Sequence, residues 1–205
     1  MPLIAALTLE QQKEAASLYR SGKSAKQVAD HYGVSLDAVF YTLRKLKVPR
    51  RSIQESNRLR YENKEPSFAL RTIQTSEARE LKLAAVMLYW AEGYKASGTT
   101  VDFANSDPDM VRVFLRFLRE VCGVREDKLR VHLYCYEGQD VENLRTFWST
   151  LTSIPKSRFS KPYIKQGTAG PRGHRMHHGL VHVRYCDKKL LKQMLVWIDE
   201  YRATL

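Results

Sequence analysis

The sequence predicts an α+β protein in two parts: three short N-terminal helices, and a C-terminal domain that combines a sheet with helices. Two patterns predict this fold class. Residues 8–48 carry apolar residues at helical spacing, separated by residues that cap or break helices. From residue 76 onward, stretches that alternate like strands are interleaved with stretches of helical periodicity. The 205 residues, 43% of them apolar, are enough for one large domain or two small ones.

The three N-terminal helices, in residues 1–49, are delimited by caps and breakers. Each follows a Thr or Ser, residue types whose hydroxyl caps a helix N-terminus. Each ends at a Gly or before a Pro, which cannot continue a helix. The caps are Thr8, Ser24 and Ser35, and the ends are Gly22, Gly33 and Pro49.

A polar segment, residues 50–75, separates the two parts. It lacks a clear apolar period and contains Asn57, Asn63 and Pro66. We interpret it as a basic linker with some helical character. Its basic residues are Arg50, Arg51, Arg58, Arg60, Lys64 and Arg71.

The C-terminal domain, residues 76–205, is expected to contain four helices and four strands. Residues 129–136 alternate strictly, which is typical of a strand with one buried face. Residues 167–179 are rich in glycine and join the last two strands. The expected helices are 78–92, 108–121, 141–151 and 188–201, and the expected strands are 99–105, 129–136, 159–165 and 180–185.

The charge balance indicates a polyanionic partner. The net charge is +12 and the sequence pI is about 9.7, values typical of proteins that bind nucleic acid. The excess is concentrated in two places. Residues 1–75 hold 13 basic and 7 acidic side chains, and residues 156–192 hold 10 basic side chains and a single acid, Asp187.

Composition also excludes several classes of protein. Three cysteines without C-x-x-C spacing exclude a disulfide framework and a zinc site made of cysteines alone. The longest nearly continuous apolar run, residues 83–91, is too short to cross a bilayer. The N-terminus lacks the pattern of a secretory signal. We therefore expect a cytoplasmic, nucleoid-associated protein without a membrane partner.

Residues 28–43 have the spacing of a helix-turn-helix. Ala29 stands four residues before Gly33, and Val39 stands six after it. The small Ala lets the helices approach, Gly accepts the positive φ of the turn, and Val packs the second helix onto the first. The stretch resembles the helix-turn-helix of resolvases, transposases and small bacterial regulators. A three-helix bundle without a DNA role is the alternative, and the basic tail K-V-P-R-R argues against it.

The resemblance implies that the third helix lies in the major groove of double-stranded DNA. Residues on its exposed face and in the basic tail then contact bases or phosphates. The expected contacts are Ser35, Asp37, Tyr41, Arg44, Lys45, Arg50 and Arg51.

The apolar stretch Ala85–Lys95 contains Glu92 followed by a glycine at the end of the expected helix. A carboxylate is unfavourable there because the helix dipole is negative at its C-terminus, and a bound cation would relieve this. The stretch resembles the LAGLIDADG helix of homing endonucleases. Around it, W-A-E-G-Y-K, F-A-N-S-D-P, F-W-S-T-L-T-S-I-P and F-S-K-P-Y-I-K make residues 80–205 similar to single-motif LAGLIDADG domains of bacterial and phage proteins. The resemblance implies a concave antiparallel sheet that straddles DNA, with helices behind it.

The resemblance leaves two functions open. One is a Mg²⁺-dependent endonuclease, with Glu92 as metal ligand and Lys95 or Lys165 stabilising charge near the scissile phosphate. The other is DNA binding without cleavage, which we favour because Val86 and Met87 stand where the family helix has small residues. Mg²⁺ is a cofactor only for the nuclease. The nuclease implies a homodimer, whereas a binding protein with two DNA-binding domains is compatible with a monomer.

The basic segment 156–192 supplies further candidate DNA contacts. Its first expected strand places Lys161, Tyr163 and Lys165 on one side, where they could lie against phosphates and bases. A cluster of histidines, His174, His177 and His178, is compatible with phosphate or base contact and equally with a plain loop; its spacing is a weak metal signal. The other expected contacts are Arg158, Arg172, Arg175 and Arg184.

Together these patterns predict a sequence-specific double-stranded DNA-binding protein with a role in transcription regulation. The Mg²⁺-dependent homing-type endonuclease is the second hypothesis. An RNA-binding module that uses the same sheet is the third, and the helix-turn-helix argues against it.

Overall fold

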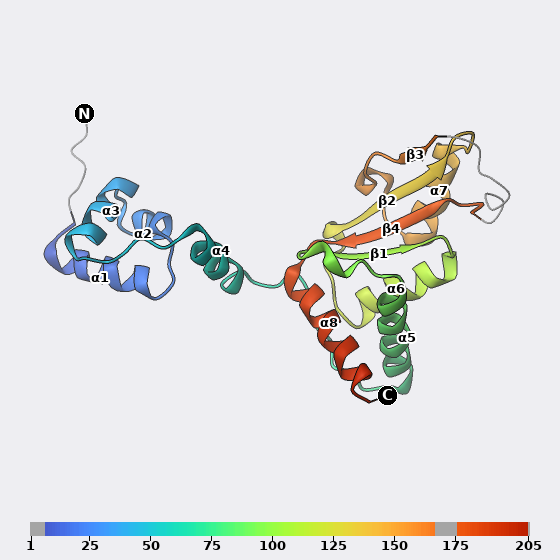
Figure 1. The fold of residues 1–205 in the computed structure, drawn as a ribbon, viewed down its shortest axis with the longest axis horizontal. Helices are drawn as coiled ribbons and strands as arrows, with labels where there is room; N and C mark the ends of the chain where they lie inside the picture. Colours follow the sequence, from blue (N-terminus) through green and yellow to red (C-terminus); the bar gives the residue numbers. More distant parts are fainter. Residues whose placement is uncertain (1–6, 167–175, 205) are drawn as a thin grey trace. The chain divides into compact units, whose positions relative to one another are not determined.

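The computed structural model describes residues 7–166 and 176–204. The chain divides into two compact units, Met1–Glu65 and Pro66–Leu205, each with its own hydrophobic core (Figure 1). The first is all-helical and the second combines a sheet with helices, so the predicted α+β class is confirmed. Within the described ranges, every helix is too short or too polar to cross a membrane.

The first unit begins with three helices, α1 (Leu9–Arg20), α2 (Ala25–Tyr32) and α3 (Leu36–Lys45). The predicted caps are present: the hydroxyls of Thr8, Ser24 and Ser35 accept hydrogen bonds from the backbone of the first turn. Small and branched side chains fill the core between the helices. Its most buried members are Ala15, Ala16, Val28, Ala29, Val39 and Leu43.

A fourth helix, α4 (Ile53–Glu62), occupies part of the expected linker and belongs to the first unit. Ser52 caps it, and none of its residues is fully buried. It lies against the turn between α1 and α2. A Cβ atom on Gly22 would lie 3.5 Å from Nδ2 of Asn63 and 3.8 Å from Cδ2 of Leu59.

The end of the expected linker, in contrast, packs into the second unit. The backbone N–H and hydroxyl of Ser67 both donate to Oδ2 of Asp187, at 2.8 and 2.7 Å. Further along, the N–H groups of Ala69 and Arg71 donate to backbone carbonyls that follow the second helix of this unit. The boundary between the two compact units lies at residues 65–66, within the segment 50–75 that the sequence analysis interprets as a linker.

The described residues of the second unit form a four-stranded sheet, four α-helices and three short 3-10 helices. The strand order is β1-β4-β2-β3, and β4 pairs antiparallel with both of its neighbours. The elements are α5 (Ser76–Glu92), β1 (Val101–Asn105), α6 (Pro108–Glu120), β2 (Leu129–Tyr136), α7 (Val141–Thr152), β3 (Tyr163–Lys165), β4 (Leu180–Tyr185) and α8 (Lys188–Arg202).

The sheet departs from the expected antiparallel pattern at β3, which runs parallel to β2. Helix α7 carries the chain back to the start of β2 before β3 begins, as a parallel crossover requires. The strand expected over 159–165 is also shorter. Phe159 forms only an isolated bridge with Val131, and Pro162, which has no N–H to donate, precedes the paired residues.

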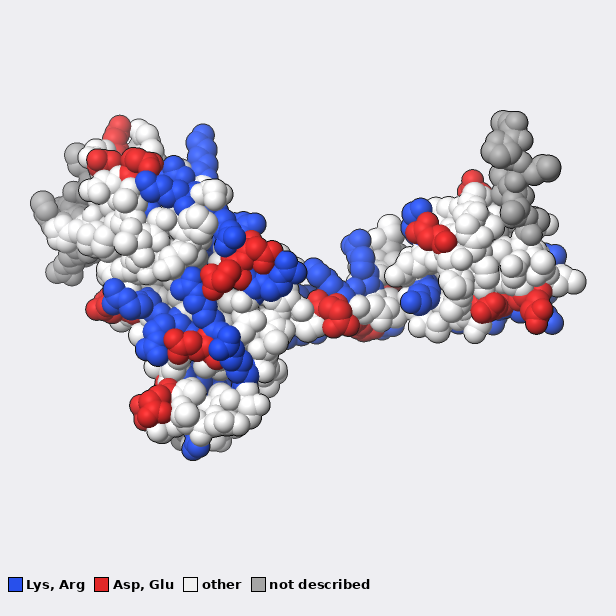
Figure 2. Space-filling model, turned by 180° about the vertical axis from the view of Figure 1, so that it is seen from behind, with Lys and Arg blue, Asp and Glu red and all other residues white. Residues whose placement is uncertain are grey.

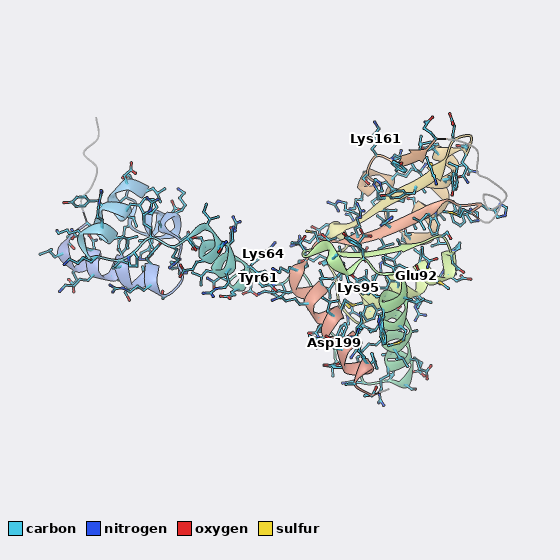
Figure 3. The ribbon with its side chains drawn as sticks, in the orientation of Figure 1. Tyr61, Lys64, Glu92, Lys95, Lys161 and Asp199 are labelled. Carbon is cyan, nitrogen blue, oxygen red and sulfur yellow. The ribbon has the colours of Figure 1, made fainter. Side chains whose placement is uncertain are left out.

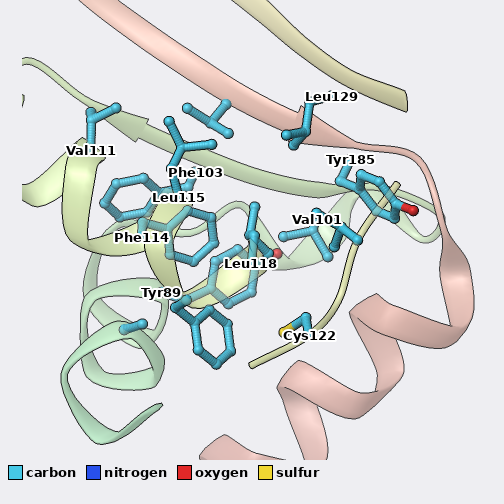
Figure 4. Close-up of a cluster of buried hydrophobic side chains, with 14 of the residues drawn as sticks. Tyr89, Val101, Phe103, Val111, Phe114, Leu115, Leu118, Cys122, Leu129 and Tyr185 are labelled. Atoms are coloured by element: carbon cyan, nitrogen blue, oxygen red, sulfur yellow. The ribbon is translucent and has the colours of Figure 1, made fainter. Parts of the chain in front are cut away.

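The core of the second unit lies between one face of the sheet and its helices (Figure 4). Alternate residues of β2 and β4 are buried, as the period of two predicts. Aromatic rings join the sheet to α5 and α6: Phe114 stacks on Phe103 with 4.3 Å between ring centroids and on Tyr89 with 5.8 Å. On the other face of the sheet, the described side chains of β2 and β4 are exposed or half-buried.

Candidate nucleic-acid interface

The turn between α2 and α3 has the conformation that the sequence predicts. Gly33 adopts left-handed φ and ψ angles of 64° and 29°. Ala29 and Val39 are almost fully buried where the two helices meet. Helices α2 and α3 thus pack against each other through the small Ala29, the turn-forming Gly33 and the branched Val39, as the predicted spacing requires.

The outer face of α3 carries the residues expected to reach DNA. Asp37, Tyr41, Arg44 and Lys45 are exposed, with Tyr41 59% exposed. Ser35 instead caps the helix: its hydroxyl accepts from the backbone N–H of Ala38 at 3.2 Å. The structure therefore gives Ser35 a local role in starting α3 and leaves the other four on the surface.

Arg50 and Arg51 are held against the first unit by aromatic rings. The guanidinium of Arg50 lies 3.9 Å from the ring centroid of Phe40, and that of Arg51 lies 4.0 Å from the ring of Tyr19. Nη1 of Arg51 also donates to the carbonyl of Lys23 at 3.1 Å. These contacts fix both guanidinium groups in place, a role that the sequence pattern did not reveal.

In the second unit, the open face of the sheet is built from cross-strand pairs of basic and aromatic residues. Arg130 is opposite Arg184, and His132 is opposite His182, on β2 and β4. At the β3 edge, Tyr134 is opposite Tyr163. Residues that lie directly opposite on paired strands share a face, so these side chains form one surface. We call it the open face.

Asp102 anchors one side of the open face. It is buried, its Oδ1 lies 2.8 Å from Nδ1 of His182, and its Oδ2 accepts from Nε of Arg184 at 2.8 Å. Burial acts to raise the pKa of Asp102, but the hydrogen bonds and charges of His182 and Arg184 outweigh it, and the pKa lies below its usual value. Asp102 thus stays ionised at neutral pH and orients the side chains of His182 and Arg184.

A hollow of about 440 Å³ lies at one end of the open face. Its lining contains four basic residues and no carboxylate. Two of them are positioned by the backbone: Nη1 of Arg130 donates to the carbonyl of Asp127, and Nη1 of Arg158 to that of Glu126, both at 2.6 Å. The four basic residues are Lys128, Arg130, Arg158 and Arg184, and we call this the sheet hollow.

His132 also lines the sheet hollow and hydrogen-bonds through Nδ1 to the hydroxyl of Ser160. Burial lowers its pKa, and the positive charges of Arg184 and His182 lower it further. His132 is therefore neutral at pH 7 and can act as a hydrogen-bonding group there.

Aromatic rings continue the open face beyond the sheet hollow. The ring of Tyr134 lies 4.8 Å from both His132 and His182 and 5.2 Å from Tyr163, between centroids. Tyr163 is 54% exposed. Exposed aromatic rings beside cations are a side-chain combination that can contact bases and phosphates together.

Charge elsewhere on the second unit is mixed. Figure 2 shows Lys and Arg side chains next to Asp and Glu side chains on the face seen from behind. Helix α6, for example, carries two ion pairs, Arg112–Asp109 and Arg116–Glu120. The carboxylate-free lining of the sheet hollow is therefore a local feature.

The candidate residues of segment 156–192 fall into several environments. Arg158 and Arg184 meet in the sheet hollow, and Tyr163 and Lys165 lie on β3. Lys161 is exposed just before β3 (Figure 3). His178 packs on Phe147 with 3.8 Å between ring centroids, whereas His177 is exposed. Arg172, His174 and Arg175 lie outside the described residues.

The sequence analysis did not select Lys128, Arg130, His132, Asp102 or His182. The alternation of Arg130 and His132 with apolar residues carried the signal that these side chains point away from the core. Their meeting with β4 depends on a pairing between segments about 50 residues apart, which no local pattern specifies.

The end of α5 places Glu92 and Lys95 near each other in the chain but gives them different surroundings (Figure 3). Glu92 is exposed. Lys95 donates from Nζ to the carbonyl of Gly93 at 2.7 Å, so its ammonium supplies positive charge at the negative end of the helix dipole. Lys165 lies on β3, at the opposite edge of the sheet from β1, the strand that follows Lys95.

These residues do not form a metal centre in a single copy of the chain. Among the described residues, no three His, Cys, Asp or Glu side chains are grouped so that they could hold an ion. Glu92 is one potential oxygen ligand, and Mg²⁺ at this position would need further ligands from elsewhere.

Val86 and Met87, which stand where the LAGLIDADG helix has small residues, lie on different sides of α5. Val86 is fully buried in the core of its own unit, so it does not obstruct a partner helix. Met87 lies in an apolar hollow of about 450 Å³ between α5 and α6. Its apolar lining is Ala84, Met87, Leu88, Ala91, Met110 and Val113.

Comparison with known proteins adds no further assignment: no family model, no curated protein and no solved structure matches this chain.

Proposed function

We propose that this protein binds double-stranded DNA, with α3 in the major groove and the open face of the sheet on DNA as well. The observation that carries the proposal is the helix-turn-helix geometry of the first unit. A left-handed Gly33 and a buried Ala29 and Val39 fix α3 so that Tyr41 and Arg44 are presented outward. That arrangement presents side chains of one helix to base edges.

The second unit supports the proposal through its charge. Four basic side chains and no carboxylate line the sheet hollow; Arg184 is paired with the adjacent Asp102, and the hollow adjoins aromatic rings on the open face. The two units together give the chain two separate surfaces suited to a polyanion, which agrees with its net charge of +12. We propose a regulatory role for such binding, at a specific site on the chromosome.

Selection of bound duplexes from a random double-stranded library by the full chain tests this proposal. We expect enrichment of a recurring site that the full chain binds more tightly than random DNA. Failure to retain any duplex at low salt would contradict the proposal. Retention of all duplexes equally would leave only non-specific binding.

The sheet's contribution is tested by the double variant Arg130→Gln/Arg158→Gln. We expect weaker binding and a shallower salt dependence, with a slope change of roughly two because each lost phosphate contact lowers it by about 0.9. Arg112→Gln/Arg116→Gln on α6 is the matched control, since both residues are already paired with carboxylates. Equal effects of the two double variants would exclude the sheet hollow as a DNA contact.

The Mg²⁺-dependent endonuclease is the second candidate, and the apolar hollow beside α5 favours it. Met87 and Leu88 lie three and four residues after Ala84, and Ala91 lies three residues after Leu88 and four after Met87, which is the spacing of a helix–helix seam. Pairing of two copies along this face would bring together the two α5 helices, each of which ends at Glu92.

A further inference from the structure

A second basic hollow lies wholly within the first unit, between α4 and the helix-turn-helix. Its volume is about 650 Å³. One wall is α4, which lies against Gly22 through Asn63 and Leu59. Another wall comes from the start of α2 and from Phe40 of α3. We call it the α4 hollow.

The lining of the α4 hollow is basic and amide-rich. Arg50, Arg51, Arg60 and Lys64 line it, and no Asp or Glu is among the lining residues. The carboxylate of Glu62 lies 3.7 Å from Nε of Arg58, a residue that is not part of the lining. The guanidinium groups of Arg50, Arg51 and Arg60 carry like charges around one hollow, and an anion between them reduces their mutual repulsion.

The three guanidinium groups that line the hollow are held in position before any ligand binds. Phe40 and Tyr19 support the guanidinium groups of Arg50 and Arg51 by stacking. Nη2 of Arg60 donates to Oδ1 of Asn57 at 3.0 Å. Nη2 of Arg51 is buried and has no hydrogen-bond partner in the structure. Planar guanidinium groups fixed in this way suit the tetrahedral oxygens of a phosphate.

We propose that the α4 hollow binds a phosphate group, and that this phosphate belongs to the DNA backbone beside the site occupied by α3. The inference rests on the proposed DNA-binding function. The adjacency of the hollow to Phe40 of α3 and to the N-terminal end of α2 favours a backbone phosphate, because those elements border the groove in the proposed complex. Helix α4 then acts as a further DNA-contacting element.

The matched pair Arg60→Gln and Arg58→Gln on the same helix tests the proposal in the full chain. Arg60 lines the α4 hollow and Arg58 does not. Anisotropy titrations of a duplex between 50 and 200 mM salt measure the affinity and its salt slope. We expect Arg60→Gln to lower the slope by about 0.9 and to weaken binding several-fold, while Arg58→Gln leaves both nearly unchanged. Arg60→Lys is expected to retain most of the slope, because the charge is kept.

A second arm distinguishes a backbone phosphate from a free one. Thermal unfolding of the full chain is followed with inorganic pyrophosphate and with chloride at equal ionic strength. A stabilisation by pyrophosphate that Arg60→Gln removes, together with an unchanged DNA slope, would keep the phosphate site and overturn its assignment to DNA.

The remaining outcomes are equally decisive. If Arg60→Gln alters neither the DNA slope nor the pyrophosphate response, the α4 hollow is not a phosphate site. If the wild type binds no DNA at all, the proposed function fails, whereas the pyrophosphate arm still decides whether the hollow binds phosphate. Circular dichroism confirms that each variant is folded, which we expect because Arg60 is exposed.

Discussion

Arg44 is the residue on which sequence-specific recognition depends most directly in the proposed complex. It is exposed on the outer face of α3. One good contact to a base edge contributes roughly 1–3 kcal/mol of discrimination. We therefore expect Arg44→Ala to weaken binding to the selected site about 5- to 150-fold and to random DNA much less, as measured by anisotropy at fixed salt. Arg20→Ala, at the end of α1, is the control. Equal losses on both duplexes would assign Arg44 to phosphate contact only.

Asp102 links the open face to the stability of the second unit. Because its pKa is lowered in the folded state, its ionised form adds stability that is present above the unfolded pKa and is lost as the pH falls through the folded pKa. Asp102→Asn leaves His182 and Arg184 without their charged partner, which should cost about 1–3 kcal/mol at pH 7.

Urea unfolding at pH 7 and at a series of acidic pH values checks this prediction. The difference in unfolding free energy between wild type and Asp102→Asn should shrink as the pH falls through the lowered pKa of Asp102, because the folded wild type then takes up a proton on this carboxylate. Asp127→Asn removes an exposed partner of Arg125 and should change stability much less than Asp102→Asn does. If the difference in unfolding free energy between wild type and Asp102→Asn is the same at every pH, the charge of Asp102 does not contribute to stability.

At this scale the sequence predicted the cap and turn residues well, because their roles are local. Thr8, Ser24 and Gly33 act on neighbours within three or four residues. The partners of Asp102 could not be predicted, since His182 and Arg184 are 80 and 82 residues away along the chain.

Among the elements, α5 decides between the two candidate functions. Under the proposed function we expect the wild type to leave supercoiled plasmid uncut in Mg²⁺ or Mn²⁺, and Glu92→Gln to change DNA affinity little. The physical reason is that Lys95 already supplies a positive charge at the end of this helix, so Glu92 does not need a bound cation to offset the helix dipole. Plasmid nicking on gels is the measurement.

The opposite result would be cutting by the wild type, loss of cutting in Glu92→Gln and unchanged cutting in Glu80→Gln on the same helix. That result would show that the protein is an endonuclease and would contradict the proposed function of binding without cleavage. Ala84→Glu places a charge in the apolar hollow beside α5, so loss of both cutting and dimerisation in this variant would assign the α5 face to the catalytic dimer.

The boundaries of β2 and β4 follow from the sequence because each has one apolar and one polar side. Strand β3 does not, since Tyr163, Ile164 and Lys165 are all exposed and its direction depends on the crossover through α7. Helix α4 has no buried residues, so its sequence has no apolar stripe from which the helix could be predicted. The two basic hollows could not be predicted from the sequence either. Each is formed because the packing of separate elements brings basic side chains together, and the periodicity of a single element does not reveal that packing.

For the whole molecule, the division at residues 65–66 makes a direct prediction. Fragments 1–65 and 66–205 should each fold, because each contains its own core. Each should bind DNA more weakly than the intact chain, since a tether converts the second contact into an intramolecular step. Fragment affinities by anisotropy, beside their equimolar mixture, provide the measurement. A fragment that equals the intact chain would mean that only one unit binds.

The hydrogen bonds that tie Ser67 to Tyr185 and Asp187 bear on the order in which the chain acquires its structure. They join segments about 120 residues apart, whereas the contacts of α1, α2 and α3 are local. Folding slows as the mean sequence separation of contacts grows. The first unit can therefore form early during synthesis, while the second must wait until β4 and α8 have been made. In refolding experiments the helix-turn-helix should appear in a fast phase and the anchored sheet in a slower one.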